Sequence, residues 1–408
     1  MKGPSTDQSL SKRQTKLSFV LLALLLIAGP ACGSFHSKLG ANENSSAVIP
    51  PASDDEDGDD WWNNPTPTPS PTATPGSTPS PTPSPTPPPS PTPLPSLGFR
   101  VMTFNIKGIP CLGDNAVASI GSVLGLKRCP LVNDGFTRST RERVAELIQR
   151  LQTLKAEGQE PDVILLQEAF TAENWIFDDS AVESIPGRSG YPYHAWGSPA
   201  RIGEGIDDYW NLIFEKRSKI RGLLSSGLLI LSKHPIEAVK RFEFGDVCTI
   251  DDCASNKGVL LTRIRVASLG LTMDIANTHQ QAGVANASIR NIQSQLAASF
   301  IHGQRTGRVL FYGGDFNYRL PSQEPAASVI ETVLQVQHAG RECKALGPEL
   351  CEIPNSSNLD RVAGNSLDHI YFKGAEDTIL SPVFVESPAW TFGGGLPLSD
   401  HLPIIAEF

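Results

Sequence analysis

Short apolar runs bounded by turn residues recur along the chain from residue 99 to the C-terminus, and they predict a series of β-strands. Tight connections such as Ser268-Leu269-Gly270 favour antiparallel pairing of neighbouring strands. The expected strands are 99–105, 163–166, 211–214, 227–231, 258–266, 271–277, 308–312, 367–372 and 403–408.

Three segments show the helical period instead. In 138–155 apolar residues recur at spacings of three and four, and further helices are expected at 286–301 and 326–334. Many strands with few helices predict an α/β protein in which helices flank two packed, largely antiparallel sheets. No internal repeat of fixed period is visible in the sequence.

The N-terminal part has the pattern of an export signal. Lys12, Arg13 and Lys16 precede the apolar run 17–28, which is short for a membrane span and is followed by small residues. We therefore expect 1–31 to be a signal peptide. Cys32 stands where bacterial lipoproteins are acylated, and ordinary cleavage after Ala31 is the alternative; either outcome makes the protein exported, as a cell-envelope lipoprotein or a secreted protein.

Two low-complexity segments follow the signal. The acidic polar segment 32–64 contains an Asp/Glu run at 54–60 that lacks the spaced ligands of a calcium loop, so we expect a solvated stretch. The segment 65–96 alternates Pro with Thr and Ser, which favours polyproline II, and it could act as a spacer of about 90 Å. Only 97–408 can then bury a sizeable core, and we expect one large catalytic domain there.

Six cysteines in this domain of an exported chain invite disulfides. They fall into three sequence-local pairs, which favours the bridges 111–129, 248–253 and 343–351. A zinc site is the alternative, but no Cys-x-x-Cys pair or matching histidine cluster supports it.

Charge bears on the class of substrate. Of 34 basic and 43 acidic residues, 5 and 8 lie before Leu97, which leaves the expected domain with a net charge of −6. A protein that binds a duplex through its phosphates usually presents a basic face, so a dedicated nucleic-acid binder is disfavoured.

Polar residues suited to catalysis stand at the ends of the expected strands and in two closing motifs. They are Asn105, Glu168, His279, Asp315 with Asn317, Asp368, and Asp400 with His401. Each residue alone is ordinary in a turn or at a strand end, but together they suggest a site. Oxygen ligands such as Glu168 and Asn105 suit magnesium or manganese rather than zinc. Two histidines with carboxylates can supply a base, an acid and charge stabilisation around an attacked phosphorus.

This set resembles the endonuclease/exonuclease/phosphatase superfamily over 99–408. The resemblance implies a four-layered α/β sandwich and metal-dependent hydrolysis of phosphate esters, with Mg²⁺ as cofactor and Mn²⁺ or Co²⁺ as substitutes. It also implies a role for each residue. Asn105 and Glu168 are metal ligands with Asp400 near the metal, His401 is the base oriented by Asp368, His279 stabilises the transition state, and Asp315 and Asn317 hold the reacting phosphate region.

Two segments narrow the resemblance to the neutral, bacterial-type sphingomyelinases. Asp252 and Lys257 stand five residues apart, as in the Asp–Lys pair of that family, and Thr278-His279-Gln280-Gln281-Ala282 is similar to its Thr-His-Leu-Gln-Ala motif. The resemblance implies cleavage of sphingomyelin to ceramide and phosphocholine at a membrane surface, with Asp252 and Lys257 in substrate binding and no obligate protein partner. An exposed strand-end lysine is the alternative for Lys257.

A lipid substrate also calls for an apolar rim. Trp390, Phe392 and Leu396 precede Ser-Asp-His and could form it, although they could equally be core residues, and the segment looks shorter than the aromatic hairpin of secreted bacterial sphingomyelinases. An exported nuclease or a broad-specificity phosphodiesterase or phosphatase is the alternative function. The basic residues that favour it are Arg201, Lys216, Arg217, Lys219 and Arg221.

Overall fold

A computed structural model describes residues 96–408 apart from 109–110, 113–139, 172–176, 179, 201–223, 250–251, 254, 306–308, 356, 376–379 and 394. The expected signal peptide with Cys32, the acidic segment, residues 65–95 of the expected spacer, the strand expected at 211–214 and the basic residues at 201–221 lie outside the described residues. Within the described ranges, no helix is long and apolar enough to cross a membrane.

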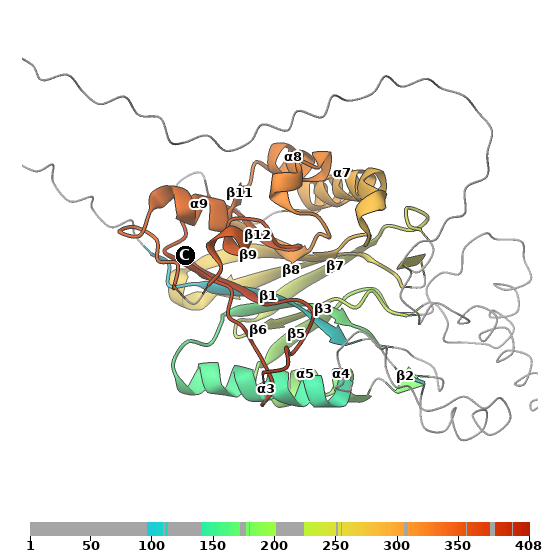
Figure 1. The fold of residues 1–408 in the computed structure, drawn as a ribbon, viewed down its shortest axis with the longest axis horizontal. Coiled ribbons are helices and arrows are strands. Elements are labelled where there is room, and N and C mark those ends of the chain that lie inside the picture. The colour runs from blue at the N-terminus through green and yellow to red at the C-terminus, as the bar shows by residue number, and fades with distance from the viewer. Residues whose placement is uncertain are drawn as a thin grey trace, which may run out of the picture. The chain divides into compact units, whose positions relative to one another are not determined.

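Two mixed sheets of six strands form the centre of the fold (Figure 1). The first has the order β13 (Phe384–Glu386), β14 (Ile404–Glu407), β1 (Arg100–Gly108), β3 (Val163–Ala169), β6 (Leu229–Ser232), β5 (Tyr193–Trp196). The second has the order β11 (Gln337–His338), β12 (Asp368–Lys373), β10 (Val309–Asp315), β9 (Leu271–His279), β8 (Gly258–Val266), β7 (Ile236–Glu243). A separate pair joins β2 (Cys111–Leu112) to β4 (Phe177–Asp178).

Each sheet has one parallel pair at its centre, β1 with β3 and β9 with β10, and its other pairs are antiparallel. One long helix connects each parallel pair, α3 (Thr140–Ala156) in the first sheet and α7 (Ala287–Gln304) in the second. Two antiparallel strands then flank each side of the pair. The two halves therefore share one topology, although no repeat is visible in the sequence.

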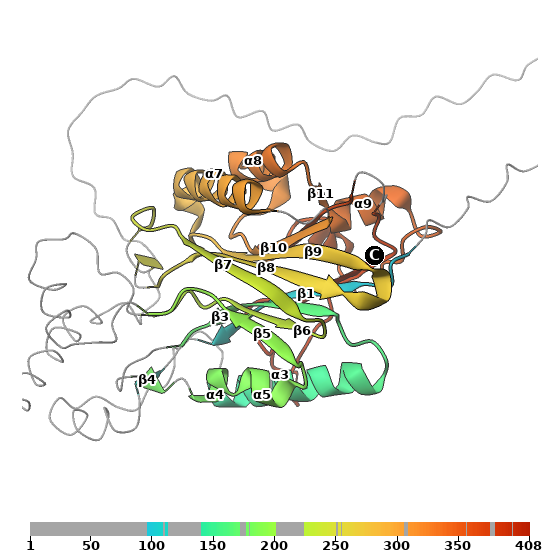
Figure 2. The ribbon, with the colours of Figure 1, turned by 180° about the vertical axis from the view of Figure 1, so that it is seen from behind.

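The strands bury side chains on both faces, which gives four layers (Figures 1 and 2). Val163 and Leu165 of β3 belong to the core between the two sheets. Ile164 and Leu166 belong to the core under α3, because successive strand residues point to opposite faces. A third core joins the second sheet to α7 and α8 (Pro325–Leu334). The expected four-layered α/β sandwich is confirmed.

Most expected elements are confirmed with small shifts at their ends, and the missed ones are short or exposed. Strand β7 was missed because its sequence, Ile-Glu-Ala-Val-Lys-Arg-Phe-Glu, lies at a sheet edge and carries charges toward solvent. The other missed strands and α-helices are β2, β4, β5, β11, β13, α4 (Ser180–Glu183), α5 (Ile185–Ser189), α9 (Ala339–Leu346) and α10 (Leu359–Val362).

Two of the expected disulfides, Cys248–Cys253 and Cys343–Cys351, are present. Because these four cysteines are bridged, they do not form the alternative zinc site. The third expected bridge involves Cys129, which lies outside the described residues.

Gly314 is required where β10 passes β9. Its φ is +147°, and a Cβ at this position would lie 2.1 Å from the Thr278 carbonyl oxygen. We expect Gly314→Ala to lower the free energy of unfolding by roughly 1–3 kcal/mol in urea denaturation. Gly303 of α7 has open space around it, so Gly303→Ala should raise that energy by about 0.5–1 kcal/mol. Equal stabilities of the two variants would contradict the steric argument.

Candidate active site

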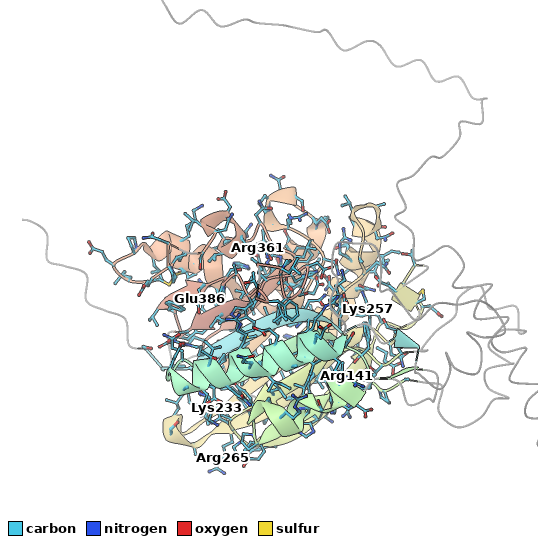
Figure 3. All side chains as sticks on the ribbon, turned by 60° about the horizontal axis from the view of Figure 1, so that its bottom comes forward. Arg141, Lys233, Lys257, Arg265, Arg361 and Glu386 are labelled. Carbon is cyan, nitrogen blue, oxygen red and sulfur yellow. A yellow bond between two sulfur atoms is a disulfide. The ribbon has the colours of Figure 1, made fainter. Side chains whose placement is uncertain are left out.

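The polar strand ends meet at one edge of the sandwich. Asn105 and Gln167 are register partners where β1 and β3 end, and Asp315 of β10 is opposite both His279 and Asp368. In Figure 3 Lys257, which lies just before β8, is at this end of the sandwich, and Lys233, which follows β6, is at the other. The structure thus brings together residues that are up to 300 positions apart in the sequence.

The buried amide of Asn105 connects the two sheets. Its Nδ2 donates to Oε1 of Glu168 at 3.0 Å and to Oδ2 of Asp315 at 2.9 Å. Glu168 has the left-handed φ of 53°, and the β1–β3 register shifts between Asn105 and Gly108. A Cβ at Gly108 would lie 2.5 Å from the Glu168 carbonyl oxygen, so glycine is needed beside this bend.

Glu168 has the character of a ligand for a hard cation. Its Oε2 is buried and has no hydrogen-bond partner in the described part of the chain. Burial raises the pKa of Glu168. The hydrogen bond from Asn105 and the charge of Lys257 act in the opposite direction and lower it in part. A divalent cation would satisfy this oxygen and offset the burial, so Glu168 and Asn105 fit a magnesium site.

Asp400 lies at the solvent side of this group. Its side chain is 42% exposed, and its Oδ2 pairs with Nζ of Lys107 at 2.9 Å. Its charge still raises the pKa values of Glu168 and His401. The structure therefore places Asp400 within electrostatic reach of Glu168 and His401, in an ion pair with Lys107.

His401 is held between two carboxylates. Its Nδ1 lies 2.8 Å from Oδ2 of Asp368, and its Nε2 lies 3.8 Å from Oδ2 of Asp315. Burial lowers the pKa of His401, but the charges of Asp368 and then Asp315 outweigh burial and raise it to about 10. The pKa of Asp315 is raised, chiefly by burial. The three residues bring one ligand atom each within 4.8 Å of the others and could also hold a metal ion.

His279 faces the same carboxylate from the other side. Its Nε2 lies 3.5 Å from Oδ2 of Asp315 and 3.0 Å from Nζ of Lys257. Burial, followed by the charges of Lys257 and His401, lowers the pKa of His279 well below its ordinary value. His279 is therefore neutral at physiological pH, and an Nε2 that accepts from Lys257 leaves the ring proton on Nδ1.

Asp252 and Lys257 pair with each other inside the protein, at 2.7 Å between Oδ1 and Nζ. Lys257 is buried, so it is not the exposed strand-end lysine of the alternative interpretation. Asn317, also expected in the site, has a left-handed φ of 56°. Its backbone N–H donates to Oδ1 of Asp315 at 2.9 Å, and its side chain donates to the Gln280 carbonyl at 3.0 Å.

The expected apolar rim needs correction at Trp390. Trp390 is 7% exposed, and its ring packs edge-on against Phe104 in the core under β1. Phe392 is partly buried against the same core. Trp390 is therefore a core residue, because the turn that carries it folds back over the sheet. Leu396 is exposed at 38% and remains the candidate for a rim contact.

Several residues that support the site were missed in the sequence. Gln167 donates to Oδ1 of Asn277 at 2.8 Å, a buried link between the sheets directly behind the site. Oγ of Ser399 donates to the Asn105 carbonyl at 2.7 Å and connects the Ser-Asp-His motif to β1. The fully buried Arg290 donates to the Gln281 carbonyl and pairs with Glu324. Gln167 and Ser399 stood beside recognised motif residues, whereas a helical arginine gives no such signal.

Comparisons with known proteins identify related sequences and folds. A model of the Endonuclease/Exonuclease/phosphatase family matches residues 102–401. A search of curated proteins found no match.

Solved structures with a similar fold include a bacterial toxin, a bacterial sphingomyelinase and a TDP2 protein. Beta toxin from Staphylococcus aureus, with bound magnesium ions, is 17% identical over 76% of this chain and 99% of its own, with a TM-score of 0.47. Sphingomyelinase C from Streptomyces griseocarneus is 19% identical over 77% and 99%, with a TM-score of 0.47. D. rerio TDP2 with a single-strand DNA product is 14% identical over 76% and 98%, with a TM-score of 0.45. At these values the substrates of those proteins do not carry over to this chain.

The carboxylate of Asp368 should control the protonation of His401. We expect Asp368→Asn to lower the pKa of His401 from about 10, because burial would then be opposed by less negative charge. An NMR titration of the imidazole in the presence of a chelator measures this. Asp360→Asn in the exposed α10 is the matched control and should leave the titration unchanged. An unshifted His401 in Asp368→Asn would show that the pair does not set its pKa.

Proposed function

The chain belongs to the Endonuclease/Exonuclease/phosphatase family, and on that basis we propose that it is a magnesium-dependent phosphodiesterase that hydrolyses sphingomyelin to ceramide and phosphocholine. The observation that supports the reaction class is the His401–Asp368 pair, which faces Asp315. At the same edge of the sandwich, Oε2 of Glu168 is buried and has no hydrogen-bond partner among the described residues. A base, an oriented carboxylate and a cation ligand are the parts that such a hydrolysis needs.

The residues of the chain divide the reaction between them. Nε2 of His401 accepts a proton from the attacking water, while Asp368 holds Nδ1 and so fixes the ring tautomer. Glu168 and Asn105, with Asp400 beside them, would hold Mg²⁺, for which Mn²⁺ or Co²⁺ could substitute. When bound, the cation supplies positive charge at the phosphate oxygens and offsets the carboxylate charge that raises the pKa of His401.

The remaining polar groups bind and position the phosphate. Asn317 and Asp315 lie on the side of the site nearest Gln280, where they can orient the leaving-group region. His279 lies on the β9 side, and Nζ of Lys257 is 3.0 Å from its Nε2. We assign to His279, together with the positive charge of the Lys257 ammonium beside it, the stabilisation of the charge that develops on the phosphoryl group.

The choice of a sphingolipid over other phosphodiesters rests on the resemblance of the Asp252–Lys257 spacing to that of the bacterial-type sphingomyelinases. In this chain the two side chains form an ion pair next to His279. A lipid substrate at a membrane surface also agrees with the exposed Leu396 close to the Ser-Asp-His motif. Two disulfides in the described domain fit an exported protein, whether secreted or anchored through Cys32, and we propose no obligate protein partner.

Phosphocholine release tests the substrate. We expect the full chain to release phosphocholine from sphingomyelin-containing vesicles with Mg²⁺ and to stop on addition of a chelator. Plasmid DNA in a parallel reaction should stay intact. Nicked DNA with unchanged lipid would replace this proposal by the alternative, an exported nuclease, and hydrolysis of only small phosphate esters would indicate a broad-specificity phosphatase.

The role of His401 as base can be tested separately from the substrate. We expect His401→Ala to lower turnover by about 10² to 10⁴-fold, because a positioned base contributes this much, while the free energy of unfolding changes little. His302→Ala, in the exposed part of α7, is the matched control and should keep the full rate. A rate above about a tenth of the wild-type value in His401→Ala would refute the assignment.

A further inference from the structure

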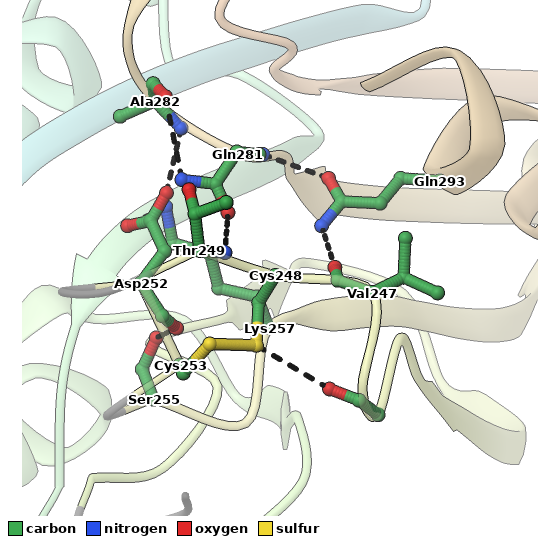
Figure 4. Close-up of a disulfide and its surroundings, with 11 residues drawn as sticks. Val247, Cys248, Thr249, Asp252, Cys253, Ser255, Lys257, Gln281, Ala282 and Gln293 are labelled. Atoms are coloured by element: carbon green, nitrogen blue, oxygen red, sulfur yellow. Dashed lines mark hydrogen bonds and ion pairs between the residues drawn. A yellow bond between two sulfur atoms is a disulfide. The ribbon is translucent and has the colours of Figure 1, made fainter. Parts of the chain in front are cut away.

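A covalently closed loop lies beside the candidate active site, between β7 and β8. The Cys248–Cys253 bridge closes it, and both cysteines are nearly inaccessible. Asp252 stands next to the bridge inside this loop (Figure 4). The residue whose carboxylate pairs with Lys257 is therefore adjacent to a covalent cross-link within this loop.

Hydrogen bonds fasten the same loop to the segment that follows His279. The backbone N–H of Thr249 donates to Oε1 of Gln281 at 2.9 Å, and that of Gln281 donates to Oε1 of Gln293 at 2.8 Å. Nε2 of Gln293 then donates to the Val247 carbonyl at 2.7 Å, which returns the chain of bonds to the loop. Figure 4 shows these bonds around the disulfide.

Asp252 uses both carboxylate oxygens within this arrangement. Oδ1 pairs with Nζ of Lys257 at 2.7 Å, and Oδ2 accepts from the backbone N–H of Ala282 at 2.6 Å. The carboxylate therefore bridges the start of β8 and the segment after β9. The position of the Asp252 carboxylate therefore depends on the conformation of the loop between β7 and β8.

The ammonium group of Lys257 has an acceptor for each of its three N–H groups. They are Oδ1 of Asp252, Nε2 of His279 at 3.0 Å and the Gln280 carbonyl at 3.0 Å. A lysine has three donors and no acceptor, so Lys257 could bind a substrate phosphate only by giving up one of these partners. In this arrangement it acts on His279 instead.

We propose that the Cys248–Cys253 bridge positions Asp252, and that Asp252 holds Lys257 on His279 rather than on the substrate. Asp252 and Lys257 are then positioning residues that keep His279 in one orientation with its proton on Nδ1. The inference rests on the proposed function, because His279 is assigned to that reaction.

The two disulfides of the described domain provide a matched pair of variants. We expect Cys248→Ser/Cys253→Ser to lower kcat by about 10- to 100-fold with little change in KM, because a misplaced group costs rate more than ground-state binding. Cys343→Ser/Cys351→Ser removes a bridge of similar loop length, and it should keep kcat. Equal losses of kcat in the two variants would show that removing either bridge lowers kcat through a general loss of stability, and this would overturn the proposal.

A double-mutant cycle tests whether the bridge acts through Asp252. Asp252→Asn alone should lower kcat to a similar extent and should lower it no further when combined with Cys248→Ser/Cys253→Ser. The same substitution combined with Cys343→Ser/Cys351→Ser should give the loss of Asp252→Asn alone. Additive losses with the first pair would show that the bridge and Asp252 act independently.

The ¹⁵N spectrum of the His279 ring gives a readout that needs no substrate. One tautomer, protonated on Nδ1, is expected in the wild-type protein and in Cys343→Ser/Cys351→Ser, and a mixture is expected in Cys248→Ser/Cys253→Ser and in Asp252→Asn. If the wild-type protein hydrolysed no phosphodiester, the proposed function would fail. The spectrum would still test whether the Cys248–Cys253 bridge and Asp252 position His279. An unchanged tautomer after loss of the Cys248–Cys253 bridge would overturn it.

Discussion

One oxygen atom, Oδ2 of Asp315, is the point on which the candidate active site depends. It accepts from the Asn105 amide at 2.9 Å, and both histidines approach it, His279 at 3.5 Å and His401 at 3.8 Å. Asn105 belongs to β1 of the first sheet and His279 to β9 of the second, and His401 precedes β14 of the first sheet. The Asn105 amide and the charges of His401 and Lys257 favour the ionised form of this buried carboxylate, since an unpaired buried charge costs several kcal/mol. The geometry of the site therefore depends directly on how the two sheets pack against each other.

The same edge concentrates negative charge. Asp315 and Asp368 are buried, and Glu168 is half-buried with its Oε2 inaccessible, while Lys257 is already paired with Asp252 and His401 with Asp368. Burial raises the pKa of both Glu168 and Asp315, which records the cost of keeping them ionised. A cation is the simplest group that would relieve this cost, so the electrostatics of the chain and the proposed magnesium dependence have the same origin.

The elements that could be predicted are those whose pattern is local. Continuous apolar runs such as 163–166 predict strands buried on both faces, and the polar residues that follow them predict one functional edge, since parallel strands end at the same side. Strand β7 was missed because an exposed edge strand needs no apolar pattern. The sequence left Trp390 open between rim and core, because an aromatic residue beside a catalytic motif looks the same in sequence whether it packs on Phe104 or faces water.

The amino-acid sequence alone determined the class of residues available for catalysis, their order along the chain, and the pairing of Cys248 with Cys253 and of Cys343 with Cys351, because each depends on short spacings. Only the tertiary structure decided that Asn105 connects Glu168 to Asp315, that Lys257 is saturated by protein acceptors, and that the Cys248–Cys253 loop is next to His279. These contacts join segments from different strands and both sheets. Their geometry follows from how the two sheets pack, and local pattern carries no information about that packing.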